Sequence, residues 1–250
     1  MESLIKIFKH KSSDYGLIWY QNDADNITKL RIVGSLIGCK NKNPSDETSI
    51  LPIQLLPEEV TLLVELNLAT IVQCHTNQPT SIELENYYQL QDLEWQQFEE
   101  SKRIYGTQMK EIYTKNNSKE DKPSKPMLPI AIETVSNRLS WVETVPIDWK
   151  WPMLQSDIER YNIFKSLWNR GYYLTDGSKF GADYLLYSSH PNNCHSSYMV
   201  TIMTKDEELS VLDFISLSRL GTSVNKIRLF CSWSDEVGLQ CVSSEWTGWV

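Results

Sequence analysis

The sequence lacks any long hydrophobic run. No stretch approaches the roughly 20 apolar residues that a membrane-spanning helix needs. The opening segment MESLIKIFKHKSS also lacks the long apolar core of a secretion signal. Both absences argue against a membrane or secreted protein, so we expect a soluble intracellular chain.

Cysteine is scarce, and its number is odd. The five cysteines are widely scattered along the 250 residues. This pattern argues against a disulfide framework and predicts buried free thiols in a reducing compartment. The sequence also contains no internal repeat, whereas its hydrophobic fraction of 41% is sufficient for a packed core.

Basic residues are too few to balance the acidic ones. The chain has 24 Lys and Arg against 32 Asp and Glu, for a net charge of −8. Residues 171–250 hold five basic and nine acidic residues, a local net charge of −4. Domains that bind nucleic acid on their own are usually basic. We therefore expect the C-terminal region to bind nucleic acid only weakly by itself.

One polar segment divides the chain into regions. The stretch TKNNSKEDKPSKPMLP, residues 114–129, has three prolines and no apolar periodicity, which is typical of a linker. The predicted fold class is α/β (α+β). We expect an N-terminal α/β domain over residues 1–85 and a long polar helix with the linker over 86–145. A C-terminal α/β domain on a mixed, mostly antiparallel sheet is expected over 146–250.

In the N-terminal region, one helix has clear signals. Pro57 stands at a helix start, and Glu58 and Glu59 follow in the first turn, where carboxylates suit the helix dipole. This helix is expected to run to about Leu66. Three strands and one further helix are also predicted, with strands or their flanks at 15–20 and 29–38, a strand at 68–74, and a long exposed helix at 86–113.

The C-terminal region predicts the order α, β, β, β, α, β, β. In its first helix, Ser156 and Glu159 form a possible capping box and Gly171 a left-handed stop. Apolar residues at helical spacing follow Ser156. The segment DGSKFG then predicts a hairpin between two strands. A second helix is expected to end at Gly221, before the two closing strands.

A polar loop between two predicted strands concentrates reactive side chains. It holds Tyr187, His190, Cys194 and His195. A metal site would need the distant Cys231 and Cys241, and the HxxxCH pattern lacks a usual zinc spacing. A cysteine nucleophile would need an oriented histidine, and adjacent Cys and His side chains in an extended loop tend to point apart. A third possibility is a strand-end aromatic followed by surface histidines.

Three motifs favour a different interpretation. The segments LWNRGYYLTDGSKFGADYLLYSSHPNNCH, RLGTSVNKIRLFCS and SSEW resemble the eukaryotic tRNA-intron (tRNA-splicing) endonuclease family, and in particular its catalytic subunits that cleave the 3′ splice site. The resemblance covers about residues 149–246, and GTSVNK is its most specific part. The N-terminal stretch from Leu30 to Val72 also looks like the N-terminal domain of this type of subunit.

The resemblance implies a catalytic triad of Tyr187, His195 and Lys226. His195 follows Tyr187 by eight positions, and Lys226 follows His195 by 31. The implied reaction is RNA cleavage without metal or other cofactor, giving 2′,3′-cyclic phosphate and 5′-hydroxyl ends. His195 would be the acid, Lys226 would stabilise the phosphorane, and Tyr187 would either take the 2′-hydroxyl proton or orient that group. His190 is an alternative acid, although the spacing favours His195.

The resemblance also implies a substrate clamp and partners. Arg219 and Trp246 match positions that hold a flipped-out base, in this active site or in the opposing one. Implied partners are intron-containing pre-tRNA and three other subunits, a second catalytic and two structural ones, joined in part through the edge of the last strand. Nuclear residence is expected, with no membrane partner. A non-catalytic structural subunit of the same complex and a general RNA-binding module are the alternatives.

Overall fold

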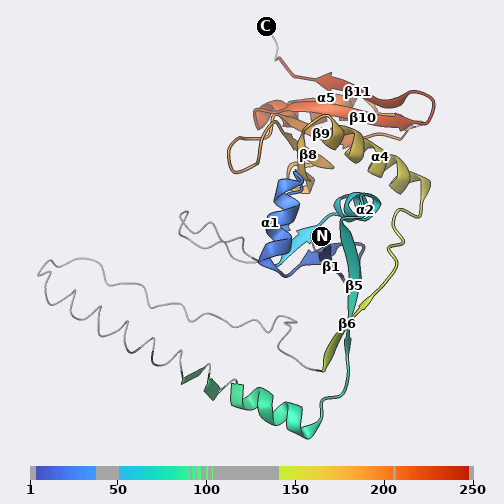
Figure 1. The fold of residues 1–250 in the computed structure, drawn as a ribbon. Helices are drawn as coiled ribbons and strands as arrows, with labels where there is room; N and C mark the ends of the chain where they lie inside the picture. Colours follow the sequence, from blue (N-terminus) through green and yellow to red (C-terminus); the bar gives the residue numbers. More distant parts are fainter. Residues whose placement is uncertain are drawn as a thin grey trace, which may run out of the picture. The chain divides into compact units, whose positions relative to one another are not determined.

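A computed structural model describes residues 4–37, 51–90, 92–93, 95–96, 100, 103, 141–204 and 207–247. The chain forms two compact units (Figure 1). The first combines Met1–Gln73 with Pro146–Val250, and the second is Cys74–Val145. The N-terminal and C-terminal regions of the sequence therefore pack together in one unit.

The first sheet lies in the N-terminal part of the first unit. Five of its six strands are β3 (Ser35–Leu36), β4 (Ile53–Leu55), β2 (Gly16–Ile18), β1 (Ile5–Lys9) and β5 (Ala69–Thr76), in this spatial order. β1 and β5 run parallel, and the other pairs described here are antiparallel. Two helices, α1 (Gln21–Lys29) and α2 (Pro57–Glu65), contribute buried residues to the core beside this sheet.

Helix α2 begins at Pro57 as predicted, but its two acidic residues do more than suit the helix dipole. Both Glu58 and Glu59 are buried. The Glu59 carboxylate accepts hydrogen bonds from the backbone N–H groups of Leu56 (2.8 Å) and Gly34 (3.1 Å), and so closes the start of the helix. Burial raises the pKa of Glu59 to about 7.

Part of the predicted strand over residues 29–38 is wrong. Helix α1 ends at Lys29, and a turn through Arg31, which has a φ of 60°, leads to the two-residue strand β3. Only Ala24 and Ile27 of α1 are fully buried apolar residues. The helix thus buries two apolar side chains and has no long apolar stripe.

The second sheet forms the C-terminal part of this unit and confirms the predicted element order. Its strands are β11 (Gly238–Ser244), β10 (Ile227–Ser234), β9 (Tyr198–Ile202), β8 (Tyr184–Tyr187) and β7 (Tyr173–Asp176), in this spatial order. Only β9 and β10 run parallel. The mixed, mostly antiparallel sheet is therefore confirmed.

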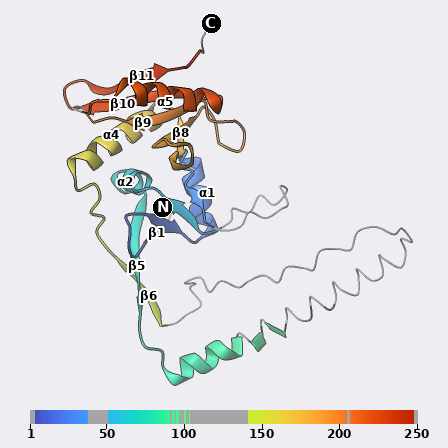
Figure 2. The ribbon, with the colours of Figure 1, turned by 180° about the vertical axis from the view of Figure 1, so that it is seen from behind.

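Two helices accompany this sheet. α4 (Gln155–Asn169) packs on it from the side of α2, as two opposite views show (Figures 1 and 2). α5 (Val211–Ser223) packs against β10 through Phe214, whose ring stacks on Phe230 at a centroid distance of 5.3 Å. The turn before β8 contains a short 3-10 helix, η1 (Ser178–Phe180), in the predicted hairpin.

The predicted capping box of α4 is wrong. The helix begins at Gln155, and its N-cap is Leu154, two residues before Ser156. Asp157 accepts hydrogen bonds from the backbone N–H groups of Leu154 (3.2 Å) and Met153 (3.4 Å). The Asp157 carboxylate thus satisfies N–H groups that the helix leaves unpaired. The predicted stop at Gly171, with a φ of 95°, is confirmed.

The predicted glycine stop of α5 is also wrong. The helix continues through Gly221 to Ser223, and the left-handed residue that follows it is Asn225, with a φ of 55°. Gly221 is buried where the chain turns back on the helix. A Cβ at this position would lie 2.9 Å from the carbonyl oxygen of Lys226. Glycine is therefore needed for a close approach, and not to end the helix.

The second unit contains the end of β5, strand β6 (Val142–Pro146) and a helix that includes residues 81–90. Thr80 and Glu83 form a reciprocal cap at the start of this helix. Most of the helix predicted over 86–113 and all of the predicted linker over 114–129 lie outside the described residues.

Candidate active site

The register of the second sheet brings two of the predicted catalytic residues together. β8 pairs Leu186 with Tyr198 of β9, and β9 pairs Tyr198 with Ile227 of β10. Tyr187 follows Leu186, and Lys226 precedes Ile227. The two residues therefore lie on either side of the chain just before it enters β9. Residues that are 39 positions apart in the sequence thus lie at the ends of β8 and β10, on either side of the chain entering β9.

Side-chain alternation places both residues on one face of this sheet. Tyr184 faces α4, because its ring packs edge-on against Phe164. Tyr187, three residues later, therefore points to the opposite face. Lys226 shares that face with Phe230, which stacks under α5. The phenol and the ammonium consequently lie on the α5 side of the sheet, at the same end of β8 and β10.

Lys226 also connects the site to the segment carrying His195. Its Nζ donates a hydrogen bond to the carbonyl oxygen of Ser196 at 3.0 Å. The next residue, Ser197, donates from its backbone N–H to Leu186 O and accepts from Ile227 N–H, both at 3.0 Å. His195 is solvent-exposed directly before this anchored segment. The chain thus places the phenol and the ammonium on either side of the segment that carries the His195 imidazole.

The second imidazole of the loop, that of His190, lies near Tyr187. The ring of His190 packs edge-on against Tyr173, at a centroid distance of 5.8 Å, and Tyr173 is the β7 partner of Tyr187. The backbone N–H of Asn192 donates to His190 Nδ1 at 3.2 Å. An accepting Nδ1 places the hydrogen of the neutral ring on Nε2. His190 is therefore held by local contacts close to Tyr187.

The cysteines have other surroundings. The thiol of Cys194 contacts the Ser189 hydroxyl at 3.3 Å, and this hydrogen bond lowers the pKa of Cys194. Cys231 and Cys241 face each other across β10 and β11, with their sulfur atoms 2.7 Å apart. In the parts of the chain that the structure describes, no group of three His, Cys, Asp or Glu residues is arranged to hold a metal ion.

A buried arginine near Lys226 in the sequence is a feature that sequence reasoning missed. Arg228 is completely buried, two positions along β10 on the same face. Its guanidinium donates to Gly181 O and to Thr201 Oγ1, each at 2.9 Å, and to Leu217 O at 3.3 Å. These contacts join η1, β9 and α5 to β10. Burial lowers the pKa of Arg228. In the sequence, the only indication of this buried residue is one Arg in the alternating pattern of a predicted strand.

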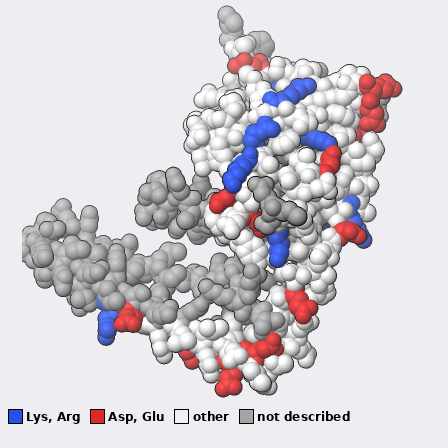
Figure 3. All heavy atoms as spheres, viewed as in Figure 1, with Lys and Arg blue, Asp and Glu red and all other residues white. Residues whose placement is uncertain are grey.

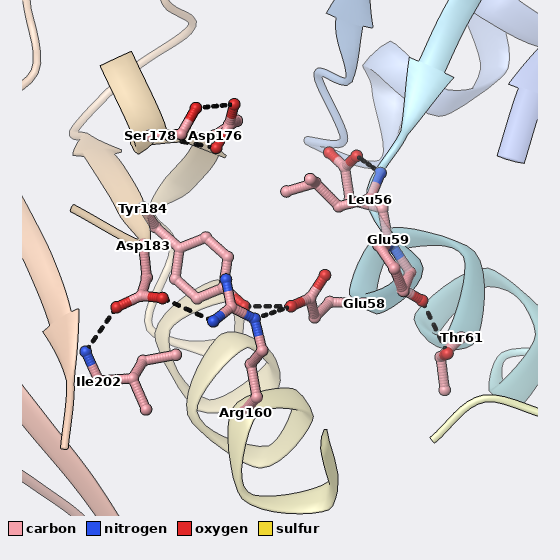
Figure 4. Close-up of polar contacts among 11 residues, drawn as sticks. Leu56, Glu58, Glu59, Thr61, Arg160, Asp176, Ser178, Asp183, Tyr184 and Ile202 are labelled. Carbon is pink, nitrogen blue, oxygen red and sulfur yellow. Dashed lines mark hydrogen bonds and ion pairs between the residues drawn. The ribbon is translucent and has the colours of Figure 1, made fainter. Parts of the chain in front are cut away.

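A second network that the sequence does not reveal links α2 to the start of β8. Figure 4 shows Arg160 of α4 between two carboxylates. Its Nε donates to Glu58 and its Nη1 to Asp183, both at 2.6 Å. The Tyr184 hydroxyl also donates to Glu58. Burial and the neighbouring Glu58 charge raise the pKa of Tyr184 well above its usual value, so this hydroxyl stays protonated. The network ends at Ile202, whose N–H donates to Asp183 at 2.8 Å.

The two residues predicted to clamp a base lie next to each other. The Arg219 guanidinium carbon is 5.7 Å from the centre of the Trp246 ring. The Thr222 hydroxyl accepts from Trp246 N–H at 3.1 Å and donates to Trp246 O at 3.2 Å, which attaches the end of the chain to α5. An exposed guanidinium beside a half-buried indole gives a flat, cationic surface suited to stacking.

Basic side chains are not absent from this region despite the acidic balance. Several Lys and Arg side chains lie over the C-terminal sheet on the face shown in Figure 3, with acidic groups toward its margins.

Among the described residues, no helix is both long and apolar enough to cross a membrane.

Comparisons with known protein families find matches in both the N-terminal and the C-terminal parts of the chain. Residues 158–238 match the family described as "tRNA intron endonuclease, catalytic C-terminal domain". Residues 5–74 match the family "TSEN34-like, N-terminal domain". The second match agrees with the resemblance of the N-terminal stretch, and apart from Cys74 both matched segments lie in the first structural unit.

Similar curated proteins carry matching names. The chain is 31% identical to mouse "tRNA-splicing endonuclease subunit Sen34" over 128 residues, covering 48% of this chain and 40% of the relative. It is 28% identical to the Schizosaccharomyces pombe "Probable tRNA-splicing endonuclease subunit sen34", covering 82% of this chain and 78% of the relative. A "tRNA-splicing endonuclease" of Methanothermobacter thermautotrophicus is 33% identical over 89 residues, which are 35% of this chain and 52% of the relative. The matched segments span 40% of the mouse relative and 41% of the human one.

Proposed function

Since the chain belongs to the tRNA-splicing endonuclease family, of the eukaryotic type, we propose that it is the catalytic subunit that cleaves pre-tRNA at the 3′ splice site. The observation that carries this proposal is the convergence of Tyr187, Lys226 and the segment carrying His195 at one end of β8, β9 and β10. A structural subunit that had lost its chemistry would have no need to keep these three groups together.

The proposed reaction is an internal transesterification. The ribose 2′-oxygen attacks the adjacent phosphorus, the bond to the 5′-oxygen breaks, and the products are a 2′,3′-cyclic phosphate and a 5′-hydroxyl. Tyr187 takes or orients the 2′-hydroxyl proton, and His195 protonates the leaving 5′-oxygen. Lys226 stabilises the negative charge of the phosphorane. These three side chains can supply each proton transfer without a metal ion or another cofactor.

Several properties of the assembled enzyme belong to the same proposal. Arg219 and Trp246 stack on a flipped-out base near the intron–exon junction. The chain acts in the nucleus, in a heterotetramer with a second catalytic and two structural subunits. β11 is at the edge of its sheet, and the side chain of Val242 on it is 65% exposed. This edge suits strand pairing with a partner. The net charge of −8 suggests that the isolated chain has little activity.

The test is cleavage of an intron-containing pre-tRNA by the complex reconstituted with its partner subunits. His195→Ala is expected to abolish the 3′ cut and leave the 5′ cut intact, with cyclic-phosphate ends at the cuts that remain. His190→Ala is the matched control, because this second imidazole lies in the same loop, and it is expected to retain both cuts. Retention of both cuts in His195→Ala, with loss in His190→Ala, would move the acid to His190. Retention in both variants would indicate a structural subunit.

A further inference from the structure

An open cleft lies in the first unit, away from the residues assigned to catalysis. Its volume is about 540 Å³. Lys9, at the end of β1, contributes to its wall together with the next two residues, His10 and Lys11. Lys150, from the segment between β6 and α4, also lines it. Residues from two distant parts of the sequence thus form one surface.

The charge of this cleft is opposite to that of the whole chain. Three amino groups line it, from Lys9, Lys11 and Lys150, and the acidic residue in the lining is Asp148. Asp14 lies outside the lining and is 3.9 Å from Lys9 Nζ, at the limit of an ion pair. The cleft therefore keeps a positive charge in a chain whose net charge is −8. Such a surface favours an anionic ligand.

Two of its donors are held in place by neighbours. Lys9 Nζ lies 5.8 Å from the centre of the Trp149 ring, and the Lys9 side chain is only 30% exposed. His10 Nδ1 is 2.8 Å from the Ser13 hydroxyl and accepts from the Ser12 N–H at 3.4 Å. An accepting Nδ1 leaves the hydrogen of the neutral ring on Nε2. His10 can therefore donate from its other nitrogen.

We propose that this cleft binds the phosphodiester backbone of RNA and holds pre-tRNA at a distance from the bond that is cut. This inference rests on the proposed function, since it takes pre-tRNA as the RNA. Amino groups and a neutral imidazole N–H are typical donors to phosphate oxygens, and they bind without reading sequence. The lining consists mainly of charged and polar side chains. A protein partner is a weaker fit, because interface centres are depleted in charged residues, lysine among them.

The experiment measures pre-tRNA affinity of the assembled complex as a function of salt. The variant Lys9→Gln/Lys11→Gln/Lys150→Gln removes all three charges. The slope of log affinity against log salt is expected to become shallower by about three, or about one for Lys150→Gln alone. Lys29→Gln is the matched control, because Lys29 is an exposed lysine of the same unit that does not line the cleft. It is expected to leave the slope unchanged.

Further comparisons separate the possible outcomes. The triple Lys→Arg variant keeps the charges and is expected to retain the wild-type slope. A shallower slope in both triple variants would point to damaged folding and contradict the proposal. An unchanged slope in the folded Gln variant would overturn it. Impaired subunit assembly with a normal RNA slope would overturn it in favour of a protein ligand. A wild-type complex that binds pre-tRNA but does not cut it would refute the proposed function, while the slopes would still decide the role of the cleft.

Discussion

The buried carboxylate of Glu58 should be a main stabilising contact between α2 and the C-terminal sheet. Its side chain is 2% exposed and accepts hydrogen bonds from Arg160 and from the Tyr184 hydroxyl. In Glu58→Ala both donors lose their acceptor. Removing one partner of a buried ion pair costs about 3–5 kcal/mol. The Arg160 side chain is 35% exposed and keeps Asp183, so we expect the lower end, about 3 kcal/mol.

The same helix contains a matched control. Glu65 accepts hydrogen bonds from Lys165 and Tyr161 of α4, but its side chain is 46% exposed. Exposed ion pairs contribute little, so Glu65→Ala should cost no more than about 1 kcal/mol. Both variants also lose one glutamate from α2, which makes their helix propensities comparable.

Urea and thermal unfolding of the purified chain, followed by circular dichroism, measure the difference. For a protein of this size, about 3 kcal/mol corresponds to a fall of about 6–12 °C in Tm. The reasoning would be refuted if Glu58→Ala and Glu65→Ala lost equal stability, or if Glu58→Ala lost less than about 1 kcal/mol. The double variant Glu58→Ala/Arg160→Ala should lose less than the two single variants added together, because the two side chains form a direct contact.

Three further outcomes follow from particular contacts. Burial raises the folded-state pKa of Glu59 to about 7, so its contribution to stability is complete below its ordinary pKa of 4.5 and is lost as pH rises through 7. Unfolding at several pH values should show this loss in wild type and not in Glu59→Gln. Parallel curves of unfolding free energy against pH for the two proteins would contradict it. In Gly221→Ala the new methyl group would displace the Lys226 carbonyl, so single-turnover cleavage should slow by about 10- to 100-fold; an unchanged rate would show that the turn adapts. Trp246→Ala should weaken the interaction of the reconstituted enzyme with its substrate by about 1–3 kcal/mol, whereas Trp246→Phe should retain most of it, and equal losses would argue against stacking.

The order of helices and strands in the C-terminal region could be predicted because its signals are local. The DGSKFG turn and the left-handed Gly171 each act over a few residues, and both occur as predicted. The two errors there also involve local contacts, but the residue preferences at those positions do not indicate them. Asp157 closes α4 because the chain before it folds back toward that carboxylate. Gly221 lies within the last turn of α5, where a Cβ would come too close to the Lys226 carbonyl oxygen.

The N-terminal helix α1 was missed for a different reason. Its sequence, QNDADNITK, has few apolar residues, and only Ala24 and Ile27 supply its apolar burial. A helix this short is stable only through contacts that the sequence does not display. The same limit applies to the networks of the site. Arg160 and Glu58 are 102 positions apart, and nothing in either local sequence indicates their pairing.

The candidate residues themselves could be found from spacing and resemblance, but their geometry could not. Whether Tyr187 and Lys226 share a face depends on the register of three strands. A shift of one residue in β8 would turn Tyr187 to the α4 side of the sheet. The sequence contains the residues of the site, while the pairing of β8, β9 and β10 determines whether they meet.

That register depends on residues far from the site. Asp183, at the start of β8, binds the N–H of Ile202 at the far end of β9, and Arg160 holds the same carboxylate. Glu58 in turn holds Arg160 and the hydroxyl of Tyr184. An α2 residue thus contributes to the alignment of the strand that ends in Tyr187. The N-terminal part of the chain supplies no proposed catalytic group, but by this route it supports the geometry on which the proposed chemistry depends.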